Sequence, residues 1–214
     1  MGDNNIYYRR NLPHYQPLNA AYFVTFRLAG SLPKEVVVRL KEKQEENVRL
    51  LGSIKDKNER KQKLMQLRKV YFGKFDKFLD KISNGPHWLQ DDSIAKIVAE
   101  AIQYRNGKDY ELLAYCIMPN HVHMVFTVTS VVRRVSSRYI VTDILESLKW
   151  YTAKKCNKAL HRKGQFWQHE SYDHVIRSQK ELSNIINYVL YNPVTASLIS
   201  DWKQWKWSYC RDEC

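Results

Sequence analysis

The chain has 214 residues, a length that suits a single domain over residues 1–214 with its own hydrophobic core. Its 35 Lys and Arg against 22 Asp and Glu give a formal net charge of +13. No run of about 18 apolar residues is present, so we expect neither a membrane-spanning helix nor a membrane partner. The charge and the 14 Tyr and 6 Trp favour a nucleic-acid partner over a merely solubilising surface, because aromatic rings stack on unpaired bases.

The N-terminal stretch and the cysteines favour a cytoplasmic location. "MGDNNIYYRRNLPHYQ" lacks the apolar core of a secretion signal. The four cysteines are not spaced as metal-binding pairs, and we expect all four to be reduced thiols.

The first half of the chain predicts a strand followed by a helical insertion. Residues 20–30 are rich in aromatic and β-branched side chains and end at a glycine, which is typical of a strand. Residues 34–79 are dense in Lys, Glu, Gln, Arg and Leu, and Gly52 marks a break between two helices. The stretch is too long for a crossover connection, so we expect a helical insertion at about residues 34–85.

The remaining elements alternate between strands and helices. We expect strands at 110–118, 121–129 and 172–178, and helices at 91–107, 141–160 and 179–193, the last stopped by Pro193. Without the insertion, the order is β-α-β-β-α-β followed by one more helix. That order predicts an α+β fold with a ferredoxin-like split βαβ core and an antiparallel sheet.

Two histidines begin the strand at 121–129. Residues i and i+2 of a strand share a face, so His121 and His123 point the same way. Two neighbouring neutral imidazoles can provide two nitrogen ligands to a metal ion. The alternative is a pair of surface histidines on the open face of an antiparallel sheet.

A third ligand could come from the last helix. In "NYVLYNP", Tyr188 and Asn192 are four residues apart and therefore lie on one helical face. Asn192 precedes Pro193, a position biased away from helix, which could turn its amide outward. An amide oxygen suits a hard cation such as Mg²⁺. The alternative is a pair that only packs and caps the helix.

Four segments resemble one family. "MPNHVHMVF" (118–126) resembles the histidine–hydrophobic–histidine motif of the HUH endonuclease superfamily. "YVLYNPVTASLI" (188–199) is similar to the tyrosine-helix signature of the REP-associated tyrosine transposases. "GQFWQHESYDHVIRS" (164–178) and "YYRRNLPHYQPLNAAYFVTFR" (7–27) resemble segments of the same family in the same order.

The resemblance implies a single-tyrosine transposase with a C-terminal tyrosine-bearing helix. It makes Tyr188 the catalytic nucleophile and His121, His123 and Asn192 the ligands of a divalent metal, Mg²⁺ or Mn²⁺. Asn192 would occupy a position that is glutamine in related insertion-sequence transposases. Tyr191 is a rival nucleophile. The family includes dimers that exchange the tyrosine, so both a monomer and a homodimer are compatible with the resemblance.

The implied activity is cleavage and rejoining of single-stranded or hairpin DNA, at REP-like hairpins, through a 5′-phosphotyrosine intermediate. The implied setting is the bacterial cytoplasm, in association with the nucleoid. One alternative is a DNA-binding regulator on the same fold that does not cleave. Another is a metal-dependent phosphodiesterase that uses water, with Tyr188 in a structural role.

Five basic or aromatic residues are candidates for DNA binding. They could contact phosphates or stack on bases, although each could equally belong to an ordinary solvated surface. They are Arg133, Arg134, Lys149, Trp150 and Arg177.

Overall fold

A computed structural model describes residues 7–9, 13–15, 17, 19–81, 85–128 and 139–211. They form two compact units, one of Met1–Ala29 with His87–Cys214 and the other of Gly30–Pro86. Each unit is considered by itself.

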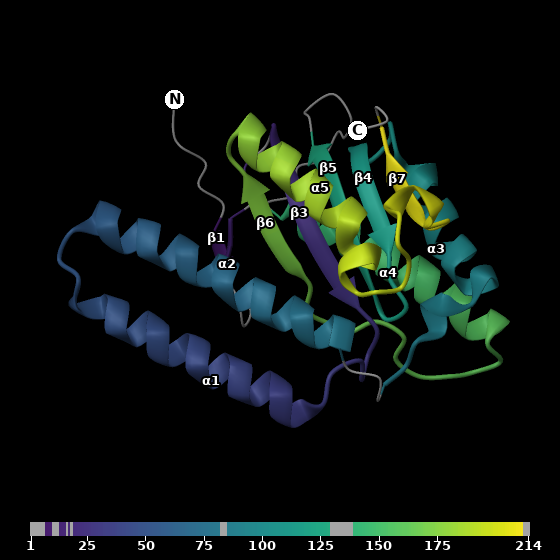
Figure 1. Cartoon of the computed structure of the whole chain (residues 1–214), viewed down its shortest axis with the longest axis horizontal. Helices are drawn as coiled ribbons and strands as arrows, with labels where there is room; N and C mark the ends of the chain where they lie inside the picture. The colour runs from purple at the N-terminus through teal and green to yellow at the C-terminus, as the bar shows by residue number, and fades with distance from the viewer. Residues whose placement is uncertain are drawn as a thin grey trace. The chain divides into compact units, whose positions relative to one another are not determined.

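The first unit contains a five-stranded antiparallel sheet (Figure 1). Its strands, in spatial order, are β6 (Tyr172–Ile176), β3 (Ala20–Arg27), β5 (His121–Val128), β4 (Glu111–Ile117) and β7 (Ser208–Cys210). A separate antiparallel pair is formed by β1 (Tyr7–Arg9) and β2 (Pro13–Tyr15).

The helices of this unit complete the predicted order. They are α3 (Asp92–Arg105), α4 (Ile140–Ala159) and α5 (Gln179–Thr195), with short 3₁₀ turns η2 (Trp88–Gln90) and η3 (Trp202–Gln204). The sequence β3-α3-β4-β5-α4-β6 and the antiparallel pairing confirm the α+β, ferredoxin-like arrangement.

The two faces of the sheet have different partners. Alternate side chains of β3 and β5 are buried in the main core with apolar residues of α3 and α4; they are Tyr22, Val24, Phe26, Val122, Met124 and Phe126. The opposite face carries Phe23, whose ring lies 6.1 Å from that of Tyr188 on α5. Figure 1 shows α5 crossing the front of the sheet, with α3 and α4 on the far side.

Helix α5 does not stop at Pro193, as we expected. It continues to Thr195, and the Ala196 N–H donates to the Asn192 carbonyl oxygen over 2.9 Å. Proline removes one backbone donor, but packing of α5 against β4 and β5 opposes that local preference. The bias of a residue before proline away from helix is overridden here: Asn192 is helical and buried.

The second unit is a pair of helices, α1 (Lys34–Leu50) and α2 (Lys57–Lys81), joined through η1 (Leu51–Ser53). The break is therefore where Gly52 predicts it. The two ends of this unit lie close together. A Cβ atom built on Gly85 would be only 3.1 Å from the Gly30 carbonyl oxygen, so the backbone segments at Gly30 and Gly85 are neighbours. This arrangement fits an insertion, and the assignment of the whole chain to one domain stays a prediction.

No helix within the described ranges is long and apolar enough to cross a membrane. Cys116 and Cys156 are buried free thiols. Cys210 is disulfide-bonded, which contradicts our expectation of a reduced thiol at that position. Cysteine spacing alone does not determine oxidation state.

Candidate metal and nucleophile site

The paired histidines lie at the start of β5, directly after a tight hairpin. The Met118 N–H donates to the His121 carbonyl oxygen over 2.9 Å, which closes the turn formed by Pro119 and Asn120. Strand alternation then directs both rings to the face opposite the main core. Their Nε2 atoms are 2.9 Å apart, and both side chains are fully buried. The burial contradicts the alternative of two surface histidines on an open sheet face.

The other ring nitrogens have oxygen partners. Asn120 Oδ1 lies 2.6 Å from His121 Nδ1, and Thr25 Oγ1 lies 2.8 Å from His123 Nδ1. An amide oxygen only accepts, so His121 carries its proton on Nδ1. The Thr25 hydroxyl oxygen can accept a hydrogen bond from His123 Nδ1–H in the same way. With the protons on both Nδ1 atoms, the Nε2 lone pairs of His121 and His123 point toward the space between the two rings. Side chains that accept from Nδ1, as Asn120 and Thr25 do here, commonly orient histidines that bind metals.

Burial keeps both imidazoles neutral near pH 7. It lowers the pKa of His121 to about 3. It lowers the pKa of His123 well below its ordinary value, and the neighbouring His121 lowers it further. Neutral imidazole is the form that donates a lone pair to a metal, so the pair is available as ligands without the cost of deprotonation.

The separation of the two Nε2 atoms fits a divalent cation. Two lone pairs directed at each other across 2.9 Å repel, so the arrangement favours a proton or a cation between them. Adjacent ligands of an octahedral ion, with bonds of about 2.1 Å, are separated by about 3.0 Å. Nitrogen ligands suit a transition metal better than Mg²⁺, so of the two predicted ions the histidines favour Mn²⁺.

A row of side chains crosses the sheet through His123. In register, Tyr172 of β6 pairs with Thr25 of β3, Thr25 pairs with His123 of β5, and His123 pairs with Cys116 of β4. Phe23, two residues before Thr25, stacks on the His123 ring at 5.7 Å between centroids. The sequence patterns did not point to Thr25, Asn120 or Phe23. Of these three, only Asn120 could have been found from the sequence, because it directly precedes the histidine motif.

Tyr188 lies against the histidines and Tyr191 does not. The ring centroid of Tyr188 is 5.7 Å from that of His123, in an edge-to-face arrangement, and the residue is 37% exposed. The Tyr191 ring instead lies 6.2 Å from that of Trp202 in η3. Tyr188 is thus both adjacent to the candidate ligands and open to solvent, which a nucleophile toward a macromolecule needs.

Asn192 follows Tyr188 by one helical turn, on the helix that packs against β4 and β5. It is 2% exposed, whereas Tyr191 beside it is 51% exposed. Its place on the helix that carries Tyr188 is compatible with a third ligand, and that role stays a prediction.

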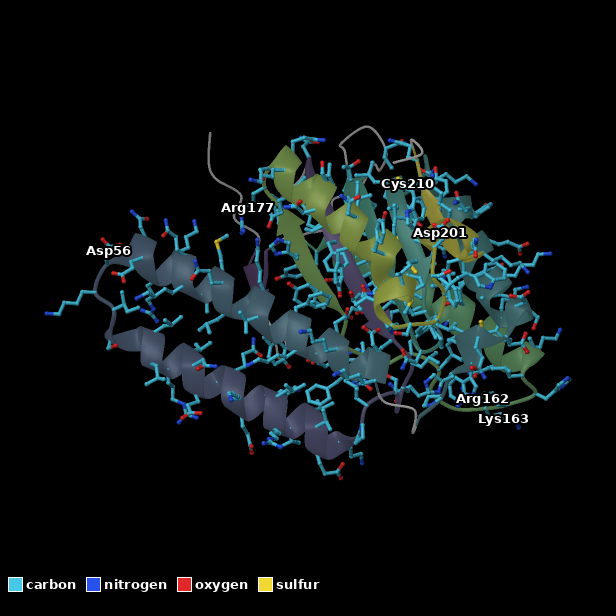
Figure 2. The ribbon with its side chains drawn as sticks, in the orientation of Figure 1. Asp56, Arg162, Lys163, Arg177, Asp201 and Cys210 are labelled. Atoms are coloured by element: carbon cyan, nitrogen blue, oxygen red, sulfur yellow. The ribbon has the colours of Figure 1, made fainter. Side chains whose placement is uncertain are left out.

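The predicted DNA-binding residues lie in different surroundings. Arg177 is exposed where β6 ends and α5 begins (Figure 2). Trp150 is 69% exposed on α4. The Lys149 ammonium donates to the carbonyl oxygens of Gln168 and His169 and to Ser171 Oγ, over 2.6, 2.8 and 3.1 Å. These three hydrogen bonds give Lys149 a structural role, because they tie α4 to the segment before β6. Contact of Lys149, Trp150 and Arg177 with DNA stays a prediction.

Arg133 and Arg134 lie outside the described residues.

Comparisons with known proteins agree with this fold and motif set. The family described as "Transposase IS200 like" matches residues 86–192, half of the chain. A Haemophilus influenzae protein, named as a candidate REP-associated tyrosine transposase, is 29% identical over 106 residues; the match covers 46% of this chain and 58% of that protein. An Escherichia coli REP-associated tyrosine transposase is 25% identical over 109 residues, covering 50% of this chain and 58% of that protein.

A solved structure is similar in fold to nearly the whole of this chain. The structure of a REP-associated tyrosine transposase bound to a REP hairpin matches with a TM-score of 0.50 and 15% identity, over 94% of this chain and 80% of that one. The resemblance inferred from the four sequence segments is therefore confirmed. The chain matches only 58% of the length of each of the two curated relatives. With its ferredoxin-like core, its paired histidines and this match, the chain belongs to the family of IS200-like transposases.

Proposed function

We propose that this protein is a metal-dependent endonuclease that cleaves and rejoins single-stranded DNA at REP-like hairpins, through a covalent 5′-phosphotyrosine. One observation carries the proposal. The Nε2 atoms of His121 and His123 converge to 2.9 Å, and the ring of Tyr188 lies 5.7 Å from that of His123. The candidate ligands on β5 thus lie beside the candidate nucleophile on α5, which supports the proposal.

Tyr188 acts as the nucleophile. Its phenolic oxygen attacks phosphorus, the bond from phosphorus to the 3′-oxygen breaks, and the tyrosine proton is released while the 3′-oxygen gains one. The product is a 5′-phosphotyrosine and a free 3′-hydroxyl. Attack by a 3′-hydroxyl on that phosphotyrosine reverses the exchange and joins strands. One ester replaces another, so no nucleotide cofactor is needed.

His121, His123 and Asn192 would hold a divalent ion, Mg²⁺ or Mn²⁺. When bound, the ion supplies charge stabilisation to a phosphate oxygen. The protein's own contribution is positional: the Thr25 and Asn120 oxygens fix the two imidazoles, and α5 presents Tyr188 beside them. One tyrosine cuts one strand at a time, which suits a single-stranded substrate.

The comparisons support the choice of DNA. One solved relative is bound to a REP hairpin. We propose single-stranded or hairpin DNA as the partner here, a bacterial cytoplasmic location near the nucleoid, and action as a monomer or homodimer.

The test is capture of a covalent protein–DNA adduct. Protein is incubated with Mn²⁺ and a labelled hairpin oligonucleotide from beside its own gene, and the adduct is resolved on a denaturing gel. Tyr188→Phe removes only the hydroxyl, so the adduct should fall to background while DNA binding persists. Tyr191→Phe is the matched control and should leave the adduct intact.

Other outcomes identify the alternatives. Binding without any adduct or cut strand, on every hairpin tested, would favour the non-cleaving regulator. Cut strand without an adduct, unchanged in Tyr188→Phe, would favour a phosphodiesterase that uses water. An adduct lost only in Tyr191→Phe would move the nucleophile to Tyr191.

A further inference from the structure

The helices on the far side of the sheet carry a second group of exposed aromatic side chains. Within the described part of the first unit, exposed aromatic residues fall into two groups. Tyr188 and Tyr191 are on α5, beside the histidines. Tyr104, Trp150 and Tyr151 are on α3 and α4, exposed by 69%, 69% and 40%. Single exposed rings are common on protein surfaces, but exposed rings that gather on neighbouring helices can mark a binding site.

Each ring of this second group has a cation beside it. Lys108 Nζ is 3.3 Å from the centroid of Tyr104, and Lys154 Nζ is 5.4 Å from that of Trp150. Tyr151 has two cations, Lys155 Nζ at 5.8 Å and Arg105 Cζ at 5.5 Å. Each of the three lysines follows its ring by four residues. Lys154 and Lys155 lie one turn further along α4, on the same helical face as their rings, and Lys108 follows the end of α3. The Arg105 contact joins α3 to α4.

A cavity of about 640 Å³ lies between the two helices. Tyr104, Arg105, Tyr151 and Lys155 line it, together with Glu100. The Glu100 carboxylate is 3.8 Å from Lys96 Nζ, which offsets part of its negative charge. The cavity therefore combines aromatic walls with positive charge.

The guanidinium of Arg105 is held in place. Its Nη1 donates to the Ala101 carbonyl oxygen over 2.9 Å, its Nη2 lies 3.5 Å from Ser147 Oγ, and its Nε lies 3.8 Å from Asp109. The Arg105 side chain is 11% exposed and faces the Asp109 carboxylate, so its role is to order the wall of the cavity and to hold the Tyr151 ring.

We propose that the surface formed by Tyr104, Arg105, Trp150, Tyr151 and Lys155 is a second contact site for single-stranded DNA. It rests on the proposed function, in which the substrate is a single strand. Unpaired bases expose their ring faces and stack on Tyr and Trp, while Lys and Arg contact the phosphates. Duplex DNA hides those faces. The site lies on α3 and α4, across the sheet from the histidines, so it would hold the strand away from the cleaved bond.

The test compares two substitutions of the same three aromatic residues, Tyr104, Trp150 and Tyr151. In one variant all three become Ala, and in the other all three become Phe. The rings are exposed, so both variants should fold, which circular dichroism checks. Hairpin oligonucleotides carry either no single-stranded tail or a thymidine tail of roughly 20 nucleotides, longer than common single-domain site sizes. Affinity is measured by fluorescence anisotropy at fixed salt.

The tail should increase the affinity of the wild-type protein. The triple Ala variant should lose at least about tenfold in affinity for the tailed oligonucleotide, because stacking is removed at three bases. The triple Phe variant should keep most of it. The double variant Tyr104→Ala, Tyr151→Ala, which keeps Trp150, should leave binding of the tail-free hairpin unchanged. A charge control, Lys155→Glu against Lys163→Glu in the loop after α4, should weaken tailed binding more at Lys155 (Figure 2).

Equal affinity of the triple Ala variant and the wild type for the tailed oligonucleotide would overturn the proposal. So would a tail that adds no affinity to the wild type. The adduct assay separates this result from the proposed cleavage, since the double variant Tyr104→Ala, Tyr151→Ala, which keeps Trp150, should still form the adduct on the tail-free hairpin. A free thymidine oligomer tests the surface even if no hairpin is cut.

Discussion

Among single residues, Thr25 matters to the candidate site because its hydroxyl contacts a histidine ring directly. It is buried on β3, in register with His123, with its hydroxyl 2.8 Å from His123 Nδ1. A hydroxyl both donates and accepts, so it can partner either neutral tautomer of the ring. When it accepts from Nδ1, the Nε2 lone pair is free to face the lone pair of His121.

Thr25→Val should weaken divalent metal binding. Valine has nearly the shape of threonine but offers no acceptor, so the His123 tautomer needed for binding loses its support. We expect Mn²⁺ affinity to fall by about tenfold or more, measured by isothermal titration calorimetry on metal-free protein. Thr25→Ser keeps the hydroxyl and should retain affinity. Equal affinity in the Val variant and the wild type would show that Thr25 does not orient the ring.

At the scale of elements, the start of α5 is fixed by a short network. The Glu181 N–H donates to Ser178 Oγ over 3.1 Å, and the Glu181 carboxylate accepts from the Arg177 N–H over 2.9 Å. His174 Nε2 lies 3.0 Å from the same carboxylate. This is a capping arrangement, and it sets where the helix that carries Tyr188 begins.

Ser178→Ala should destabilise the protein by about 1 kcal/mol, the usual effect of losing an N-cap side chain. Urea denaturation followed by circular dichroism measures it. Ser183→Ala is the matched control: Ser183 Oγ only donates to the Gln179 carbonyl within the same helix, and alanine is a better helix former. A destabilisation in Ser183→Ala as large as that in Ser178→Ala would argue against the cap.

Asp80 in α2 introduces a pH dependence. Burial raises the pKa of Asp80 to about 6, and within the described ranges its buried Oδ1 has no hydrogen-bond partner. The unfolded chain releases that proton near pH 4. Between about pH 4 and 6 the folded state therefore holds more protons, so stability falls as pH rises through this window.

Asp80→Asn should remove that slope. The stability of the variant relative to the wild type should increase from pH 4 to pH 6. Above pH 6 the difference should stay constant, because Asp80 is then ionised in both the folded and the unfolded chain. Thermal melts over this range measure the difference. Parallel pH profiles for the two proteins would show that Asp80 does not titrate as expected.

For the molecule as a whole, we expect the helical pair to be separable from the main core. All residues of the core cluster come from outside Gly30–Pro86. The backbone also approaches itself where the pair begins and ends, at Gly30 and Gly85. A short linker can therefore replace what lies between them.

Replacing residues 31–84 by a short Gly-Ser linker should leave a folded sheet with α3, α4 and α5. Circular dichroism should show a cooperative thermal transition, with less helical signal than the full chain because α1 and α2 are gone. The control is a linker of the same composition inserted at Gly52, which keeps both helices. It shows whether a Gly-Ser linker by itself disturbs folding. An aggregated or non-cooperative product from the deletion alone would show that the pair is needed for folding.

The order of elements and the local geometry of the site could be predicted from the amino-acid sequence. Strand alternation placed His121 and His123 on one face, and helical spacing placed Tyr188 one turn before Asn192. These relations hold between near neighbours in the chain, so periodicity is sufficient to predict them. The resemblance to transposases depended on the same local patterns.

Contacts between residues far apart in the sequence could not be predicted in this way and became visible in the fold. Thr25 lies opposite His123, 98 residues later, because β3 pairs with β5 in one register. Asn192 stays helical because α5 packs against the sheet, in spite of Pro193. Lys149 is held by the segment before β6. The physical reason is common to all three: strand register and helix packing are set by burial of the whole core, which no short window of sequence contains.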